Sequence, residues 1–124
     1  MISQRLPLQR AFLFIAVVVT TPAVWAHAHL THQYPAANAA MSTSPQALTL
    51  NFSEGIEPGF SGATLSGPNQ EKIKTHPAKR NEQDKTQMII PLGEPLKPGS
   101  YTVEWHVVSV DGHKTKGQYV FSVQ

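Results

Sequence analysis

The chain has 124 residues, a formal net charge of +2, 40% hydrophobic residues and no cysteine. The absence of thiols excludes disulfides, as well as zinc–thiolate, iron–sulfur and blue-copper sites of the usual kind. Ten basic residues face eight carboxylates without forming a basic run, and this argues against nucleic-acid binding. All six histidines follow residue 26.

The first 26 residues have the pattern of a secretory signal peptide. Arg5 and Arg10 supply positive charge, residues 11–19 form a short apolar core, and Val24-Trp25-Ala26 places small residues before the predicted cleavage point. This segment is too short and wrongly flanked to span a membrane. Cleavage would remove 26 of the 124 residues and leave one exported domain of 98 residues, 27–124, with no net charge.

Short alternations of apolar and polar residues divide the predicted domain into about seven strands, with no helical period. We therefore expect an all-β fold, a small antiparallel Greek-key β-sandwich, with no second domain. Residues 36–45 and 76–85 are predicted loops. The predicted strands are 29–34, 47–53, 63–66, 71–75, 86–92 and two long strands within 101–123.

The same alternation predicts which side chains face the core. On each strand every second residue is apolar, as expected for a strand with one buried face. The side chains predicted to face inward are Leu48, Leu50, Phe52, Tyr101, Val103, Trp105, Val107, Tyr119, Phe121 and Val123.

Asp111-Gly112-His113 joins the two most apolar predicted strands. It places two metal-competent side chains two residues apart on a loop, and loops carried by rigid sheets often hold functional residues. Asp-Gly is also a common turn sequence, so His113 as a solvated bystander remains an alternative.

His27 would become the N-terminal residue after cleavage. Its α-amino group, which loses a proton readily, and its ring Nδ1 can chelate one metal ion together. A second imidazole from His113 and carboxylates from Asp111 and Glu54 would complete a nitrogen and oxygen site that suits Cu(II). In the alternative, His27 follows the signal by chance and Glu54 only ends a strand, since spacing alone does not bring these residues together.

Five motifs extend this pattern over nearly the whole predicted domain. They are His27-Ala-His-Leu30 followed by Tyr34-Pro-Ala36, Leu50-Asn-Phe-Ser-Glu54, Phe60-Ser-Gly62, Pro98-Gly-Ser-Tyr-Thr-Val-Glu-Trp105 and Val107-Val-Ser-Val-Asp-Gly-His113. Together they resemble the CopC family of periplasmic copper-binding proteins, including its YobA-type members.

The resemblance implies a seven-stranded cupredoxin-like or immunoglobulin-like sandwich. It implies that His27, Asp111 and His113 bind Cu(II), with Glu54 as a neighbouring ligand or support. It also implies a protein of copper resistance, homeostasis or transport, rather than an enzyme, and a periplasmic location with a CopD-type inner-membrane partner. We expect the mature protein to be a monomer.

The methionines depart from the pattern of several CopC relatives. Those relatives carry a methionine-rich loop whose soft thioethers bind Cu(I). The corresponding residues here, Gly67 to Lys85, include no methionine; Met88 is expected in the core and Met41 in another loop. We therefore expect no separate Cu(I) site.

The remaining histidines leave an alternative open near the N-terminus. His29, third in the mature chain, would allow Cu(II) to be wrapped by backbone amides, and cleavage after Ala28 would make His29 the first residue. The resemblance favours His27. His32, His76 and His106 are expected to be surface or strand residues.

Two other functions compete with that of a copper carrier. A metal-free immunoglobulin-like interaction domain fits the fold but leaves the histidine and carboxylate pattern to chance. A small histidine-brace copper monooxygenase would use a similar N-terminal chelate. However, so small a domain offers little flat substrate surface, and two carboxylates would crowd positions that oxygen needs.

Overall fold

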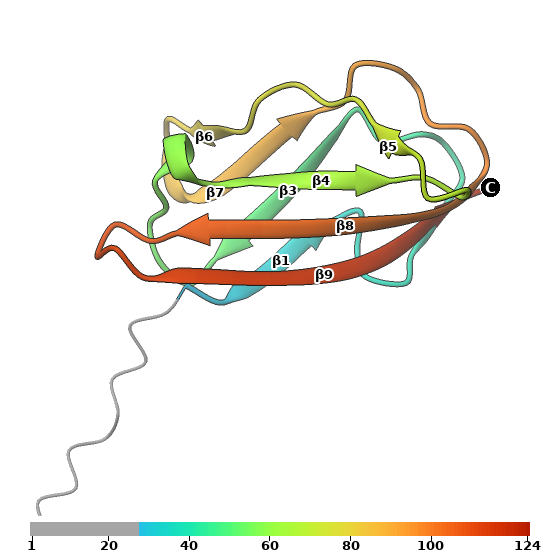
Figure 1. The fold of residues 1–124 in the computed structure, drawn as a ribbon. Coiled ribbons are helices and arrows are strands. Elements are labelled where there is room, and N and C mark those ends of the chain that lie inside the picture. Colours follow the sequence, from blue (N-terminus) through green and yellow to red (C-terminus); the bar gives the residue numbers. More distant parts are fainter. Residues whose placement is uncertain (1–27) are drawn as a thin grey trace, which may run out of the picture.

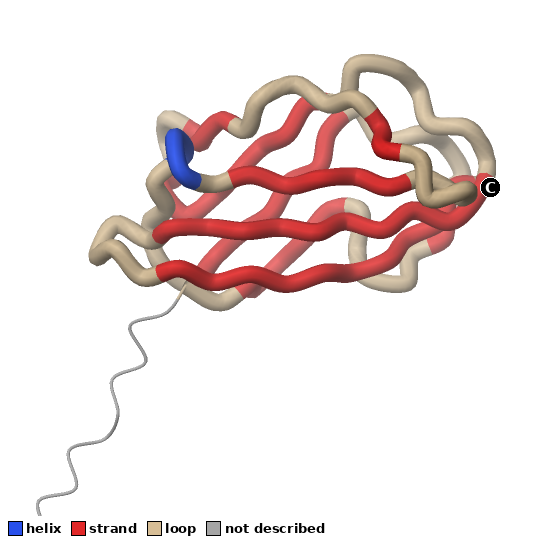
Figure 2. Tube along the Cα trace, in the orientation of Figure 1, coloured by secondary structure: helices blue, strands red, loops and turns tan. Residues whose placement is uncertain are grey.

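The computed structural model describes residues 28–124, so the predicted signal peptide and His27 lie outside the described residues. Figure 1 shows two layers of strands packed face to face, and Figure 2 shows that strands dominate, with one short helical turn. The elements are β1 (Leu30–Tyr34), β2 (Ala40–Met41), β3 (Ala47–Phe52), the 3-10 turn η1 (Pro58–Phe60), β4 (Gly62–Ser66), β5 (Lys72–Ile73), β6 (Lys79–Asn81), β7 (Asp84–Pro91), β8 (Gly99–Val108) and β9 (Lys114–Val123).

Two sheets make up the sandwich. One has the strand order β1-β3-β7-β6 and the other the order β2-β9-β8-β4-β5. Neighbouring strands are antiparallel except for β2, which pairs in parallel with β9. The predicted all-β sandwich is therefore confirmed. Among the described residues, no helix is long and apolar enough to cross a membrane.

The core lies between the sheets and follows the two-residue period of the strands. Every side chain that the sequence predicted to face inward is buried. The rings of Phe52 and Trp105 meet edge to face across the two sheets at 5.2 Å between centroids, and those of Tyr101 and Phe121 stack at 5.6 Å. Burial of these apolar groups is the main stabilising term of the fold.

Two predicted loops contain strands that the side-chain pattern does not reveal. Residues 36–45 include β2 and residues 76–85 include β6 and the start of β7. Both β2 and β6 lie at sheet edges. An edge strand can form by hydrogen bonding to the peptide groups of its neighbour, even when it has no apolar face of its own. Met41, predicted in a loop, lies on β2 and packs against the core, whereas Met88 is fully buried as predicted.

Strands β8 and β9 form the long hairpin that the sequence predicted. Trp105 on β8 lies opposite Gly117 on β9. A Cβ atom added to Gly117 would lie 2.5 Å from Cζ2 of Trp105, well inside van der Waals contact. The glycine therefore makes room for the largest side chain of the core.

We predict that Gly117→Ala lowers the free energy of unfolding by about 1–3 kcal/mol, because the added methyl group must displace the rigid indole ring. Gly59→Ala is the matched control, since nothing lies within 4 Å of a Cβ atom at that position. Chemical denaturation of both variants measures the difference. Equal midpoints would show that the indole ring moves aside without cost.

Candidate metal centre

The loop between β8 and β9, residues 109–113, is a tight turn closed by its own backbone. The N–H of Ser109 donates to the carbonyl of His113 at 2.9 Å, and the N–H of Gly112 donates to the carbonyl of Ser109 at 2.8 Å. Gly112 has a φ of 89°, a conformation that glycine adopts without steric cost. The turn therefore holds Asp111 and His113 in a defined relation.

Asp111 and His113 contact each other directly. The Nδ1 atom of His113 lies 2.9 Å from Oδ2 of Asp111. The side chain of His113 is 47% exposed and that of Asp111 is 37% exposed. A carboxylate that accepts a hydrogen bond from Nδ1 selects the tautomer in which Nε2 carries the lone pair. This is the form in which a neutral imidazole binds a metal ion through Nε2.

Ser109 supports this pair from inside the protein. It is the single buried polar residue among residues 28–124 and is 0% exposed. Its hydroxyl donates to Oδ1 of Asp111, and the His113 carbonyl oxygen is a second acceptor at 3.3 Å. The bonds from Ser109 and then His113 lower the pKa of Asp111 from 3.8 to about 2. Asp111 is therefore an anion at neutral pH.

The first described residues lie beside this loop. The hydroxyl of Thr115, two residues after His113, donates to the carbonyl of Ala28 at 3.0 Å. The N–H of His29 donates to Oγ of Ser53 at 2.8 Å, and the N–H of Ser53 donates to the carbonyl of His29 at 2.8 Å. Residues 28–29 are therefore held between the start of β9 and the end of β3.

Glu54 lies at the same end of the sandwich. It follows Ser53, which binds the N-terminal segment, and precedes Gly55, whose carbonyl accepts a hydrogen bond from the N–H of Val110 at 2.9 Å. However, no three histidine, aspartate or glutamate side chains converge as a metal-binding group within residues 28–124. The structure thus brings Asp111 and His113 together and places the Glu54 backbone nearby, while His27 lies outside the described residues.

The other histidines are exposed and lie on separate elements. His32 is on β1, His76 follows β5, and His106 is on β8, on the face opposite to the buried Trp105. They are thus surface or strand residues, as predicted.

Sequence reasoning missed the polar residues that hold the candidate centre in place. Ser109, Thr115 and Ser53 each bind a segment that carries a predicted ligand. The spacing Ser-x-Asp-x-His was visible, and the period of two that turns Trp105 and Val107 inward extends to Ser109, so this pattern was a signal for its burial.

The fold agrees with that of known relatives of the chain. The sequence matches the CopC domain over residues 30–124. The chain belongs to the CopC family.

Particular relatives support the assignment. Protein YobA from Escherichia coli strain K12 is 67% identical over 117 residues, which cover 94% of each chain. Copper resistance protein C from Escherichia coli is 35% identical over 106 residues, covering 80% of this chain and 82% of the relative.

Solved structures are similar across the whole sandwich. CopC from Methylosinus trichosporium OB3b has a TM-score of 0.74 and 28% identity, covering 79% of this chain and 94% of that one. PcoC, described as a methionine-rich copper resistance protein from Escherichia coli, has a TM-score of 0.71 and 35% identity, covering 80% of this chain and all of that one.

We predict that Ser109→Ala raises the pKa of Asp111 from about 2 toward its ordinary value of 3.8, because the largest cause of the lowered pKa is removed. A lowered carboxylate pKa stabilises the fold above pH 3.8, and this contribution is lost as the pH falls toward 2. NMR titration of the Asp111 carboxyl carbon measures the change. Ser122→Ala, on the far part of β9, is the control, and an unchanged pKa in Ser109→Ala would contradict the assignment.

Proposed function

We propose that the protein binds Cu(II) in the periplasm, after removal of the signal peptide, and serves copper resistance, homeostasis or transfer. The ligands would be the amine and ring of His27, Nε2 of His113 and an oxygen of Asp111, with Glu54 as a further ligand or support. Membership of the CopC family and copper resistance relatives support a copper-related role. The proposal rests mainly on the contact between Asp111 and His113, which lies beside the hydrogen-bonded residues 28–29.

Covalent linkage supports the part assigned to His27. This residue directly precedes Ala28, whose carbonyl is bound by Thr115. One residue extends the chain by at most about 3.6 Å. The amine of a mature chain beginning at His27 would therefore start close to the loop that carries His113.

The donor atoms suit Cu(II) rather than Cu(I). An amine, two imidazoles and a carboxylate form the nitrogen and oxygen set that favours tetragonal Cu(II), whereas Cu(I) prefers thioethers. Of the two methionines in residues 28–124, Met88 is fully buried and Met41 packs against the core. The relative PcoC is described as methionine-rich, whereas this chain has three methionines in all.

Asp111 would act in two ways. Both of its oxygens already accept hydrogen bonds, from Ser109 and His113. An ionised carboxylate has about four acceptor positions, so lone pairs remain for a metal ion. Asp111 would thus orient the His113 ring and also supply negative charge to the bound cation.

Hydrogen bonding at His29 argues against the wrapped alternative. That mode requires the deprotonated amide nitrogen of His29, which in this structure donates to Oγ of Ser53. Wrapping copper there would break this bond and the returning bond from Ser53 to the His29 carbonyl. Chelation by His27 leaves both bonds intact.

Transfer of copper as cargo fits a site at an exposed end. We propose that the mature protein is a monomer and exchanges copper with a CopD-type inner-membrane protein. We propose that it is not an enzyme; in a histidine-brace monooxygenase, the carboxylates of Asp111 and Glu54 would crowd the positions that oxygen needs.

We predict that a single residue left ahead of His27 weakens Cu(II) binding at least about tenfold to a hundredfold, because the amine becomes a poorly binding amide. His27→Ala, His113→Ala and Asp111→Ala should each weaken binding by a similar factor. Affinity is measured by competition with a Cu(II) chelator.

His76→Ala and His106→Ala are the matched controls for this series, because both remove an exposed imidazole away from the loop. They should leave the affinity unchanged. If the extended protein binds as tightly as the cleaved protein while His76→Ala does not, the site has been misplaced.

We also predict that Cu(II) stabilises the folded domain, since it would join the N-terminal segment to the β8–β9 loop. When the free copper concentration is 1,000 times the dissociation constant, the free energy of unfolding increases by about 4 kcal/mol. For a domain of this size the melting midpoint should rise by about 15–30 °C. Calorimetry with and without copper measures this rise, and no rise would contradict a tight site in the native fold.

A further inference from the structure

Phe60 is the most exposed large hydrophobic side chain among residues 28–124, at 72%, yet its backbone is firmly held. The N–H of Glu57 donates to the carbonyl of Val108 at 2.8 Å. The hydroxyl of Ser61 donates to the Glu57 carbonyl at 2.7 Å and accepts from the N–H of Val108 at 3.1 Å. The turn η1 is thereby fixed to the end of β8. A single exposed apolar side chain is common on protein surfaces, so Phe60 is informative because of the groove that it lines.

A groove of about 460 Å³ lies between Phe60 and the β8–β9 hairpin. Gly62 helps to shape it, because a Cβ atom there would lie 3.3 Å from Cε1 of His106. The His106 ring can therefore lie close to β4. The residues that line the groove are Phe60, His106, Val107, Val108, Lys114, Thr115 and Lys116.

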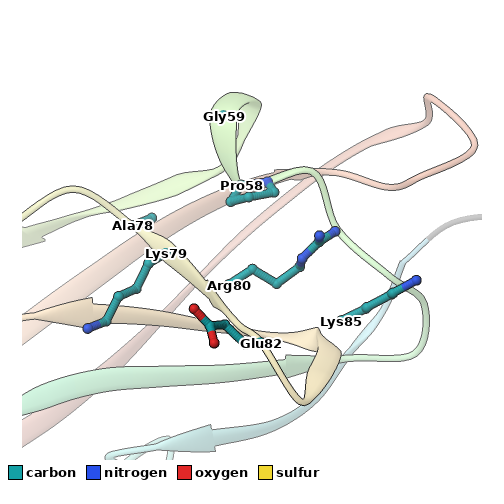
Figure 3. Close-up of a pocket in the computed structure, with 7 residues that line it drawn as sticks. All are labelled: Pro58, Gly59, Ala78, Lys79, Arg80, Glu82 and Lys85. Carbon is teal, nitrogen blue, oxygen red and sulfur yellow. The ribbon is translucent and has the colours of Figure 1, made fainter.

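The charge of this lining points to an acidic partner. Lys114 and Lys116 stand on one wall, and none of the described residues that line the groove is an aspartate or glutamate. The hollow on the other side of η1 differs: Figure 3 shows Glu82 among its basic residues. There, Arg80 already donates to the carbonyl of Ile56 at 3.0 Å. Both hollows are lined by an excess of basic residues, but only the groove at Phe60 is lined by basic residues without a carboxylate of the protein among them.

The groove also adjoins the candidate metal loop. Val108 pairs with Lys114 at the last rung of the hairpin, immediately before residues 109–113. Val110, inside that loop, is 56% exposed. A molecule seated against Phe60 and Lys114 would therefore lie beside Asp111 and His113.

We propose that this groove docks the protein with which copper is exchanged, through a segment that presents an apolar side chain between carboxylates. The apolar side chain would pack against Phe60 and the carboxylates would pair with Lys114 and Lys116. That copper is the cargo exchanged rests on the proposed function, whereas the docking of an acidic segment does not. Complementary charge at the rim would mainly speed encounter and select the partner.

The test uses a synthetic probe, the capped peptide Glu-Glu-Phe-Glu-Glu, titrated into the ¹⁵N-labelled mature protein. We expect saturable NMR shifts at the amides of Phe60, His106, Lys114 and Lys116, weakened by added salt. The capped peptides Lys-Lys-Phe-Lys-Lys and Glu-Glu-Ser-Glu-Glu should bind at least about tenfold more weakly. Equal binding of the basic peptide, or shifts centred elsewhere, would overturn the proposal.

Two variants remove the proposed contacts without touching the predicted copper ligands. Phe60→Ser and the double change Lys114→Glu, Lys116→Glu should each weaken binding of the acidic peptide at least about tenfold. The matched control is Lys72→Glu with Lys97→Glu, which reverses two exposed lysines outside the groove. If the control weakens binding equally, the effect is one of net charge and the groove is not the site.

Three readouts separate this proposal from its rivals and from the copper site. Phe60→Ser should leave the Cu(II) affinity unchanged. If the unaltered mature protein fails to bind Cu(II) but still binds the acidic peptide, only the proposed function is refuted. Binding to phosphatidylglycerol vesicles without peptide binding would assign the groove to a membrane. A concentration-dependent dimer abolished by Phe60→Ser would assign it to a second copy; either result would overturn the proposal.

Discussion

Strands β8 and β9 pair without a register break over ten residue pairs, from Gly99–Val123 to Val108–Lys114. This ladder places Trp105 over Gly117 and turns the inward side chains of both strands into the core, where Trp105 meets Phe52 of β3. It also ends in the five-residue turn that carries Asp111 and His113. Because side chains alternate with a period of two, a slip of one residue would turn the core face outward. The packing and the candidate metal loop therefore depend on the same register.

At the end of that ladder, a buried hydroxyl organises an exposed pair. Burial of Ser109 without a partner would cost free energy, and its bonds to Asp111 and His113 remove that cost. The carboxylate in turn holds the His113 ring by Nδ1. The loop is thus ordered by the protein itself, so a bound metal ion would not have to supply the ordering free energy.

Side-chain periodicity predicted the sandwich and its inward face, because those strands bury one face and alternate visibly. It missed β2 and β6, since two or three residues at a sheet edge show no alternation and pair through peptide groups. The nearness of Asp111 to His113 was predictable because the two residues lie two positions apart in the sequence. The nearness of Ala28, Ser53 and Thr115 depends on contacts 24 to 87 residues apart in sequence, which no local pattern encodes.

The central claim is that Cu(II) is bound by nitrogen from the N-terminus and from His113 at one end of the sandwich. Electron paramagnetic resonance of the mature protein with one equivalent of Cu(II) tests this most directly. The account predicts a tetragonal spectrum with nitrogen hyperfine structure that loses one imidazole contribution in His113→Ala and changes when a residue precedes His27. A spectrum that is the same in all three proteins would contradict the claim.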